Sequence, residues 1–463
     1  MILLSSYAAK ANRLPAEILS TIFINSWSTW NIDSYEPKKL FRCQLALPAV
    51  CHLWRKVALD TTALWTRVTI ANNPPYDLLE LFLSRSGTTL LDISVYMDNP
   101  IEDYDDESAA KSTAEDIHNF IKRHCSASRW RTLRLEVNHI YAFYILATWP
   151  FTHEATFPFL QSLDLIFTGS FSIDPHDTSL GKSLYNAHLE FSEPQAQLQL
   201  LKIRGLLSPH IFGKTFHKQL TGLVKLELHF SGKYEWYEHP RNSPAVRLLS
   251  EDPTSSDAVK SLDAPKVHMP MLTALSFLAI SSPVWVLDHL LTLDAPNVAT
   301  FELTFGKEPI TSINGGRVAI RQLASYIATS GPIGAKRKPK SKFPSLVHFT
   351  FSSLEESFKE DMEIILAGYP RISSLALPKC STLQPLAEAA SELARLKVGL
   401  KDVTELKRFL IMRREAGTPI QTIQAVRSAL DSPVEPSILK ELEELVDFSL
   451  VDEADDSGDA DED

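Results

Sequence analysis

One short pattern recurs along the chain from residue 65 onward, and it constrains the fold more than any other feature. Each copy has an apolar residue, two residues of any kind, a second apolar residue, one residue of any kind and a third apolar residue. Because side chains of a β-strand alternate between its two faces, the second and third apolar residues would share one face of a short strand. The middle residues of the twelve copies are Val68, Ile93, Leu133, Leu163, Leu201, Leu226, Leu275, Phe301, Phe349, Leu375, Leu396 and, weakly, Ile423.

The spacing of these copies indicates a repeat protein. Several neighbouring middle residues lie about 25 positions apart, within the range of leucine-rich repeats, and two spacings are near twice that value. Amphipathic segments fall between the later strands, which predicts one strand and one helix per unit. They cover residues 284–291, 317–327, 354–366, 383–393 and 404–414. The alternative is an ordinary α/β domain, since any parallel strand can match so loose a pattern. A proline-containing turn before four of the strands (Pro158, Pro296, Pro344 and Pro370) favours a repeated unit.

The pattern resembles a degenerate leucine-rich repeat spanning residues 61–450. The position where that family places Asn or Cys holds Asn138 in one unit and Cys380 in another, and other residues elsewhere. Two long insertions interrupt the predicted solenoid, near 231–270 and 306–342. Beyond it, residues 451–463 read as a disordered acidic tail, because Asp452 to Asp463 include eight acidic residues and no basic one.

The first sixty residues predict a small helical domain. Pro15 can begin a helix, since its missing N–H would be unbonded there in any case, and this helix should fade near Asn25. Residues 26–37 read as a loop, and a second helix covers about 38–47. Pro48 then starts a third helix, whose apolar positions recur with helical spacing. A self-contained helical cap is one explanation of these stripes.

The identities of these residues resemble an F-box, the module that joins a substrate receptor to a cullin–RING ubiquitin ligase. The relevant segments are LPAEIL at 14–19, VCHLWRKVA at 50–58 and LW at 64–65. The predicted fold is therefore α/β: an all-helical F-box at residues 1–60 followed by an irregular leucine-rich-repeat solenoid. The resemblance implies contact with a Skp-type adaptor through Leu14, Pro15, Glu17, Ile18, Leu19, Ile22, Phe23, Val50, Cys51 and Trp54.

Composition excludes several other classes of protein. The formal net charge of −11 comes largely from the tail, and the remainder lacks the basic footprint of a general nucleic-acid binder. The four cysteines lie far apart, as in reduced intracellular proteins, and no apolar run is long enough to cross a membrane. A cytoplasmic or nuclear location is therefore expected. The basic run at 336–342 is either a nuclear import signal or a solvated loop.

No familiar catalytic, metal-binding or nucleotide-binding motif occurs in the sequence. We therefore expect no catalytic residue, cofactor or metal. By resemblance, the chain is the substrate-recognition subunit of a Skp–cullin–F-box ubiquitin ligase, with an adaptor, through it a cullin, and an unknown target protein as partners. The alternative is a leucine-rich-repeat scaffold without any ligase role.

Strand geometry places a candidate target-binding surface. The residues between and beside the inner apolar positions should point to the concave face of the solenoid. A plain solvated sheet face is the alternative, and the convex loops or the insertion at 231–270 could bind the target instead. The predicted target-binding set is Arg134, Glu136, Asp164, Lys202, Arg204, Lys225, Glu227, His229, Glu302, His348, Arg395 and Lys397.

Overall fold

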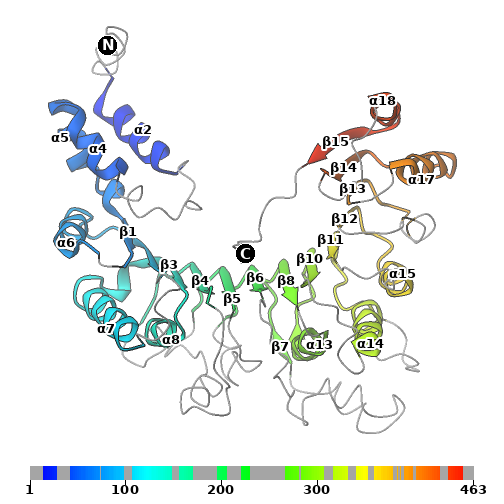
Figure 1. Cartoon of the computed structure of the whole chain (residues 1–463), viewed down its shortest axis with the longest axis horizontal. Helices are drawn as coiled ribbons and strands as arrows, with labels where there is room; N and C mark the ends of the chain where they lie inside the picture. The colour runs from blue at the N-terminus through cyan, green and yellow to red at the C-terminus, as the bar shows by residue number, and fades with distance from the viewer. Residues whose placement is uncertain are drawn as a thin grey trace. The chain divides into compact units, whose positions relative to one another are not determined.

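The computed structural model describes residues 14–28, 42–72, 74–98, 107–148, 156–169, 195–205, 220–229, 266–280, 283–306, 316–331, 340–352, 359–378, 383, 386, 391–399, 403–427 and 436–451. The chain divides into two compact units, Met1–Leu220 and Thr221–Asp463. The helices of each unit lie along one face of its strands and leave the other face uncovered by helices (Figure 1).

The first unit opens with four short helices: α2 (Ala16–Ser28), α4 (Arg42–Val50), α5 (His52–Asp60) and the 3-10 helix η1 (Thr62–Trp65). Two predicted boundaries are wrong. The first helix continues to Ser28, beyond the expected end near Asn25. The second helix continues through Pro48, and the third begins only at His52. The break falls there because Cys51 is extended (φ −161°) and caps the next helix, with its Sγ accepting a bond from the Trp54 N–H at 3.4 Å.

Five parallel strands with interspersed helices complete the first unit. In chain order, these strands and helices are β1 (Arg67–Ile70), α6 (Tyr76–Arg85), β2 (Leu91–Met97), α7 (Glu107–His124), η3 (Ala127–Arg129), β3 (Trp130–Val137), α8 (Ile140–Thr148), β4 (Ser162–Phe167) and β5 (Leu200–Arg204). Each strand pairs in parallel with the next strand along the chain, from β1 to β5.

The second unit repeats this arrangement with more strands. It contains β6 (Lys225–His229), β7 (Val267–His268), β8 (Ala274–Ile280), α13 (Pro283–Thr292), β9 (Leu293–Asp294), β10 (Thr300–Phe305), α14 (Gly316–Thr329), β11 (His348–Ser352), α15 (Lys359–Gly368), β12 (Ser374–Leu377), β13 (Arg395–Val398), α17 (Val403–Glu415), β14 (Thr422–Val426), α18 (Pro436–Leu445) and β15 (Asp447–Val451). The parallel order is β6-β8-β10-β11-β12-β13-β14-β15, and β7 pairs only with β9.

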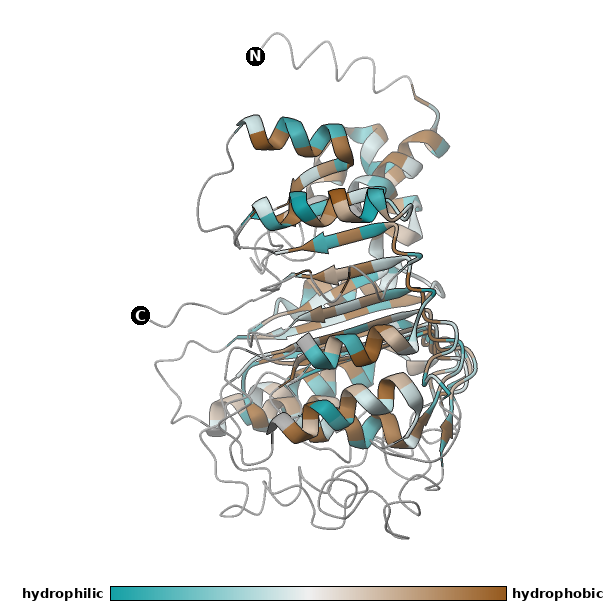
Figure 2. Cartoon of the chain, turned by 90° about the vertical axis from the view of Figure 1, so that its right-hand side faces the viewer, coloured by the Kyte–Doolittle hydropathy of each residue, from teal (hydrophilic) through white to brown (hydrophobic). Residues whose placement is uncertain are grey.

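The predicted repeat is confirmed by these strands. Each of the twelve middle residues lies in its own strand, and within each unit these strands follow one another in chain order as parallel neighbours. Within each unit, neighbouring repeats therefore bury their apolar residues against each other, as in a leucine-rich-repeat solenoid. Apolar and hydrophilic residues alternate along the strands and around the helices (Figure 2). The α/β fold with an all-helical N-terminus is also confirmed.

Several elements were not predicted. β15 carries the same pattern as the other strands, in Leu445, Phe448 and Leu450. It was missed because it directly borders the acidic tail. Helices α6, α7, α8 and α18 were also missed. In α7 the buried stripe is partly made of small residues, Ala110 and Ala114, which weakens the hydrophobic signal, and α8 is apolar all round. The pair β7 and β9 places the end of the 231–270 insertion in ordered structure at Val267.

The basic run at 336–342 lies mostly outside the described residues, but its last lysine, Lys342, is described and half-buried. The Nζ atom of Lys342 donates a bond to the Leu293 carbonyl at 2.5 Å and lies 5.2 Å from the centre of the Tyr326 ring. Burial, with a smaller contribution from Lys266, lowers the pKa of Lys342 to about 7, against the opposing effect of Asp294. This lysine therefore packs into the second unit rather than into solvent.

We expect this lysine to make stability depend on pH. Between about pH 7 and 10 the unfolded chain carries a proton on Lys342 that the folded chain has lost, so the free energy of unfolding rises with pH, by at most about 1.4 kcal/mol per pH unit. Below pH 7 both states are protonated and this contribution is constant. Lys342→Met should therefore flatten the pH dependence of denaturant unfolding, whereas Lys340→Met, at an exposed position, should leave it unchanged. Parallel curves for wild type and Lys342→Met would contradict this assignment.

Candidate functional site

The ten predicted adaptor-binding residues fall into three groups in the N-terminal helices. Five are exposed: Pro15, Glu17, Ile18, Ile22 and Val50. Three are half-buried: Leu14, Cys51 and Trp54. Two belong to the interior, since Leu19 is 1% exposed and Phe23 is 0% exposed. The structure thus places Leu19 and Phe23 in internal packing, and only the other eight can offer surface to a partner.

Internal packing explains why α2 has two kinds of apolar residue. Leu19 and Phe23 lie one turn apart and join Val57 and Ala58 of α5 in one buried cluster. The ring of Phe23 lies 5.0 Å from that of Trp54. The stripe of α2 that contains Leu19 and Phe23 is therefore the one that contributes to the core of the helical domain.

A second apolar stripe on α2 contributes nothing to this core. Ile18 is 48% exposed and Ile22 is 44% exposed, and residues at i and i+4 lie on the same side of a helix. Three further apolar side chains of the helical domain are exposed and were not singled out from the sequence: Ile24 at 38%, Leu45 at 50% and Leu59 at 38%. Together with Val50 at 54%, they give this small domain a concentration of exposed apolar side chains, a feature that typically marks an interaction site.

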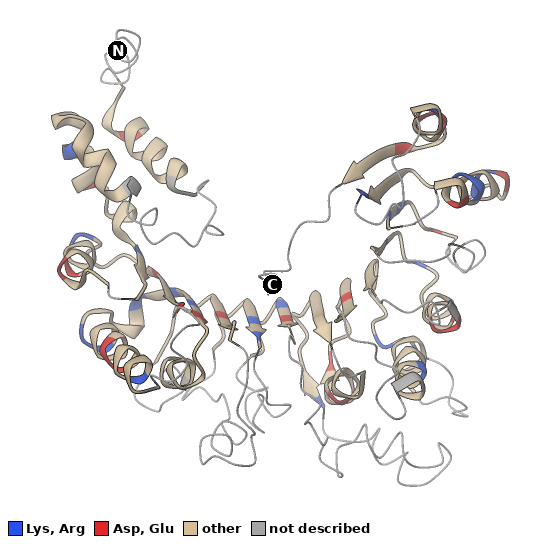
Figure 3. Ribbon diagram, viewed as in Figure 1, with Lys and Arg blue, Asp and Glu red and all other residues tan. Residues whose placement is uncertain are grey.

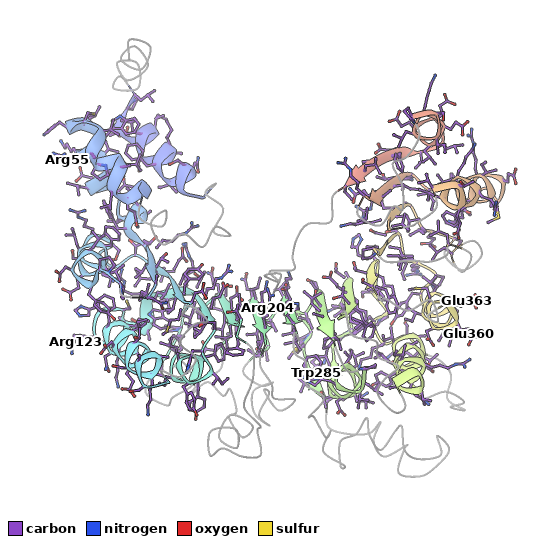
Figure 4. The ribbon with its side chains drawn as sticks, in the orientation of Figure 1. Arg55, Arg123, Arg204, Trp285, Glu360 and Glu363 are labelled. Atoms are coloured by element: carbon purple, nitrogen blue, oxygen red, sulfur yellow. The ribbon has the colours of Figure 1, made fainter. Side chains whose placement is uncertain are left out.

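Polar contacts hold the exposed residues in place. The Arg55 guanidinium, at the outer side of α5 (Figure 4), donates through Nε to the Pro48 carbonyl at 2.9 Å. This bond joins α5 to the end of α4, next to Val50. The Gln44 side-chain amide donates to the carbonyls of Leu64 and Arg67 at 3.0 and 3.3 Å. Helix α4 is therefore tied both to α5 and to the segment that enters the first strand.

The helical domain is also joined to the first repeat by a shared core. Trp65 is fully buried, and its ring lies 5.3 Å from the ring of Phe82 on α6. Its indole N–H donates to the Ala58 carbonyl at 2.8 Å, and the guanidinium of Arg85 lies 4.6 Å above the ring. Because Phe82 belongs to the same buried cluster as Leu19 and Phe23, the N-terminal helices and the first repeat pack as one body.

The predicted target-binding residues lie on the strands in the expected alternation. Most are half-buried, whereas Arg395 is exposed and Glu136 is buried at 7%. In the first unit Arg134, Asp164 and Lys202 occupy one row across three strands. Glu136 is the register partner of Ile166, which in turn pairs with Arg204. In the second unit Glu227 and Glu302 are each opposite Ser276, and the same row continues through Thr350 and Ala376 to Lys397. The other four, Lys225, His229, His348 and Arg395, occupy the rows on either side.

Many of these charges are already paired within the chain. Arg134 donates to Glu136 at 2.9 Å and lies 3.7 Å from Asp164. Burial opposes its charge, but nearby Tyr96, Asp164 and Glu136 outweigh this effect and raise the pKa of Arg134. Lys225 lies 3.1 Å from Glu227, and the Ser276 hydroxyl donates to Glu302 at 3.2 Å. A partner could engage these groups only in competition with internal ion pairs.

No group of three or more His, Cys, Asp or Glu side chains that could hold a metal ion occurs among the described residues. Within the same part of the chain, no helix has the length and apolar character needed to span a membrane.

Comparison with known proteins agrees with the geometry of the N-terminal helices. The F-box-like family model matches residues 11–71. The chain therefore carries an F-box-like domain at its N-terminus, followed by a long region of parallel-strand repeats. Among solved structures, the chain is similar to the "crystal structure of Rad7 and Elc1 complex in yeast", with 11% identity, coverage of 97% of this chain and 90% of that one, and a TM-score of 0.35. No curated protein matches the sequence.

Proposed function

We propose that this chain is the substrate-recognition subunit of a Skp–cullin–F-box ubiquitin ligase. Its F-box-like domain docks a Skp-type adaptor, and through the adaptor a cullin, while the repeats bind a target protein. The chain itself supplies no catalytic residue in this proposal. The observation that carries it is the match of residues 11–71 to the F-box-like family, together with the exposed apolar stripe of α2 within those residues.

The stripe has the energetic properties of a docking surface. Ile18 and Ile22 are half-exposed, although the domain core is already filled by Leu19 and Phe23. Fully burying an exposed isoleucine side chain stabilises a complex by about 1.5–3 kcal/mol. Two such side chains on one helical face therefore provide a substantial part of the free energy of a specific interface.

The rigid connection through Trp65 supports the same proposal. A substrate receptor works by holding a target at a defined place relative to the enzyme that modifies it, which raises the effective concentration of the reacting groups. Since the F-box-like domain shares its core with α6, the adaptor surface and the first repeat cannot swing apart independently. A flexible scaffold would not need this shared core.

We expect Ile18→Asp with Ile22→Asp to weaken binding of a purified Skp-type adaptor at least about 30-fold, because the loss of even one anchor should cost about 2 kcal/mol or more. Calorimetric titration measures the change. The matched control is Val318→Asp on α14, which is 56% exposed and lies outside the F-box-like domain. Both variants should keep the wild-type melting temperature.

The outcome also separates this proposal from its alternative. If wild-type protein binds no Skp-type adaptor, the ligase role is wrong and the chain is better described as a repeat scaffold. If the double variant binds the adaptor as tightly as Val318→Asp does, the docking surface lies elsewhere than on α2.

For the target, we propose the sheet face of the repeats. It presents both acidic and basic side chains, which suits a protein surface carrying patches of both signs better than a nucleic acid, since phosphates require a continuous basic stripe. Groups without internal ion pairs should contribute most, because binding to them displaces no existing pair.

A further inference from the structure

One part of the sheet face in the second unit has a uniform polar character. His348, Ser374, Arg395 and Thr422 are successive register partners across β11, β12, β13 and β14. The next outward-facing row is Thr350, Ala376, Lys397 and Gln424. These eight positions, called the β13 patch below, include two permanent cations, a histidine and four groups that can donate hydrogen bonds, but no acid.

The cations of the β13 patch differ from those elsewhere on the sheet face. Arg395 is exposed and Lys397 is half-exposed, and neither forms an ion pair with any other described residue. The guanidinium of Arg395 lies 3.4 Å from Nδ1 of His348. Burial and the charge of Arg395 lower the pKa of His348, as expected where positive charge is not neutralised by a nearby acid. By contrast, Arg134 and Lys225 are both held by glutamates.

Among the described residues of β10 to β15, the acidic side chains on this face lie at the borders of the patch. Glu302 on β10 is the neighbour of Thr350 and is bonded by Ser276. Asp447 on β15 is the neighbour of Thr422. Figure 3 shows blue basic segments among the strands of this part of the second unit, and both basic and acidic segments on its helices. The patch therefore favours an anionic, extended partner.

The chain contains such a partner within reach. Strand β15 ends at Val451, and the next twelve residues, Asp452 to Asp463, contain eight acids and no base. Because all these strands are parallel, their C-terminal ends lie along one edge, and β13 is two strand spacings, about 10 Å, from β15. Twelve residues can span about 40 Å when extended. Val426 is the register partner of Val451, so Arg427, the next residue after Val426, lies at the same edge of the sheet where β15 ends.

We propose that the acidic segment Asp452–Asp463 folds back onto the β13 patch and occupies it in the free protein, so that an anionic target must displace it. The contact is electrostatic and intramolecular. Because the segment directly follows β15 in the same chain, its effective concentration at the patch is on the order of millimolar, so a weak contact suffices to keep the patch occupied. This inference does not depend on docking of an adaptor by the F-box-like domain, so adaptor binding and tail binding can fail separately.

The test uses full-length protein and a fluorescently labelled peptide with the sequence of residues 452–463. Two chains are compared: wild type, and a neutral-tail variant in which all eight acids of the segment are replaced by Asn or Gln. We expect the neutral-tail variant to bind the peptide at least about tenfold more tightly than wild type, because its own segment no longer competes. Binding should weaken steeply as salt is added.

Two further variants locate the binding surface. In the neutral-tail background, Arg395→Glu with Lys397→Glu should reduce peptide binding at least tenfold. The matched control is Arg408→Glu with Arg414→Glu, which makes the same change of charge at two exposed positions of α17. That control should bind the peptide as the neutral-tail variant does, and circular dichroism should show equal melting temperatures for both.

Several results would overturn the proposal. Equal peptide affinity in wild type and the neutral-tail variant would mean that the patch is open and available to the anionic segment of another protein. Equal losses in the β13 and α17 variants would mean that the peptide responds only to net charge. Loss of binding only when Lys336, Arg337 and Lys338 are replaced by Gln would assign the tail to that basic run instead.

Discussion

Replacing Trp65 by Ala is expected to lower the free energy of unfolding of the first unit by about 3–5 kcal/mol. The indole is fully buried, packs against Phe82 and Arg85, and donates to the Ala58 carbonyl. Its removal leaves a cavity between the F-box-like helices and the first repeat and an unsatisfied carbonyl on α5. Denaturant unfolding followed by far-UV circular dichroism measures the change.

Two companion variants separate the parts of this effect. Trp65→Phe keeps a ring in the cavity but loses the indole N–H, so it should cost distinctly less than Trp65→Ala. Leu59→Ala, at a position 38% exposed in the same segment, should change stability by less than about 0.5 kcal/mol. If Trp65→Ala and Leu59→Ala shift the unfolding midpoint equally, Trp65 does not join the two parts of the unit.

The second large effect is expected at Gly205, directly after β5. Its φ is +74°, and a Cβ atom there would lie 2.2 Å from the carbonyl oxygen of Phe167, at the end of the neighbouring strand β4. Gly205→Ala therefore combines a left-handed conformation, about 1–2 kcal/mol, with a backbone clash that must push two paired strands apart, about 1–3 kcal/mol more. Chemical denaturation of the purified variant measures the sum.

Gly87 provides the control in the same unit. It also has a positive φ, +57°, but a Cβ there would meet no atom within 4 Å. Gly87→Ala should therefore show only the conformational cost. Equal losses at the two glycines would indicate that β4 and β5 separate at that end without resistance.

The strands of the fold could be predicted from the sequence because their signal is short and local. Each copy needs only two apolar residues on one face, as at Ile93 and Val95, and the register of neighbouring strands aligns those positions. Some helices were harder to predict, because the buried stripe of α7 is partly made of small residues and α8 is apolar all round. The break at Cys51 could not be predicted, since Pro48 is the stronger local signal for a helix boundary and the capping role of a cysteine depends on tertiary packing.

The candidate site could be predicted only in part, for a physical reason. A helical stripe of apolar residues shows that a face is buried, but not whether the helix itself or a partner buries it. On α2 the residues Leu19 and Phe23 belong to the internal core, whereas Ile18 and Ile22 remain exposed. On the sheet face the sequence gives the charges, but not that Arg134 is neutralised by its neighbours while Arg395 is not. Those differences arise from contacts between strands that lie far apart in sequence.

The register of the second unit has a consequence for how such a chain can diverge. Leu226 pairs with Leu275, 49 positions later, Leu275 pairs with Phe301, 26 positions later, and Phe301 pairs with Phe349, 48 positions later. The sheet thus accepts connections of very different length without any shift of register at these positions. Doubling a flexible connection costs only about 0.6 kcal/mol in closure entropy. New segments can therefore be acquired between existing strands at little thermodynamic cost, so related chains can differ widely in their connections while the strands and the N-terminal helices stay the same.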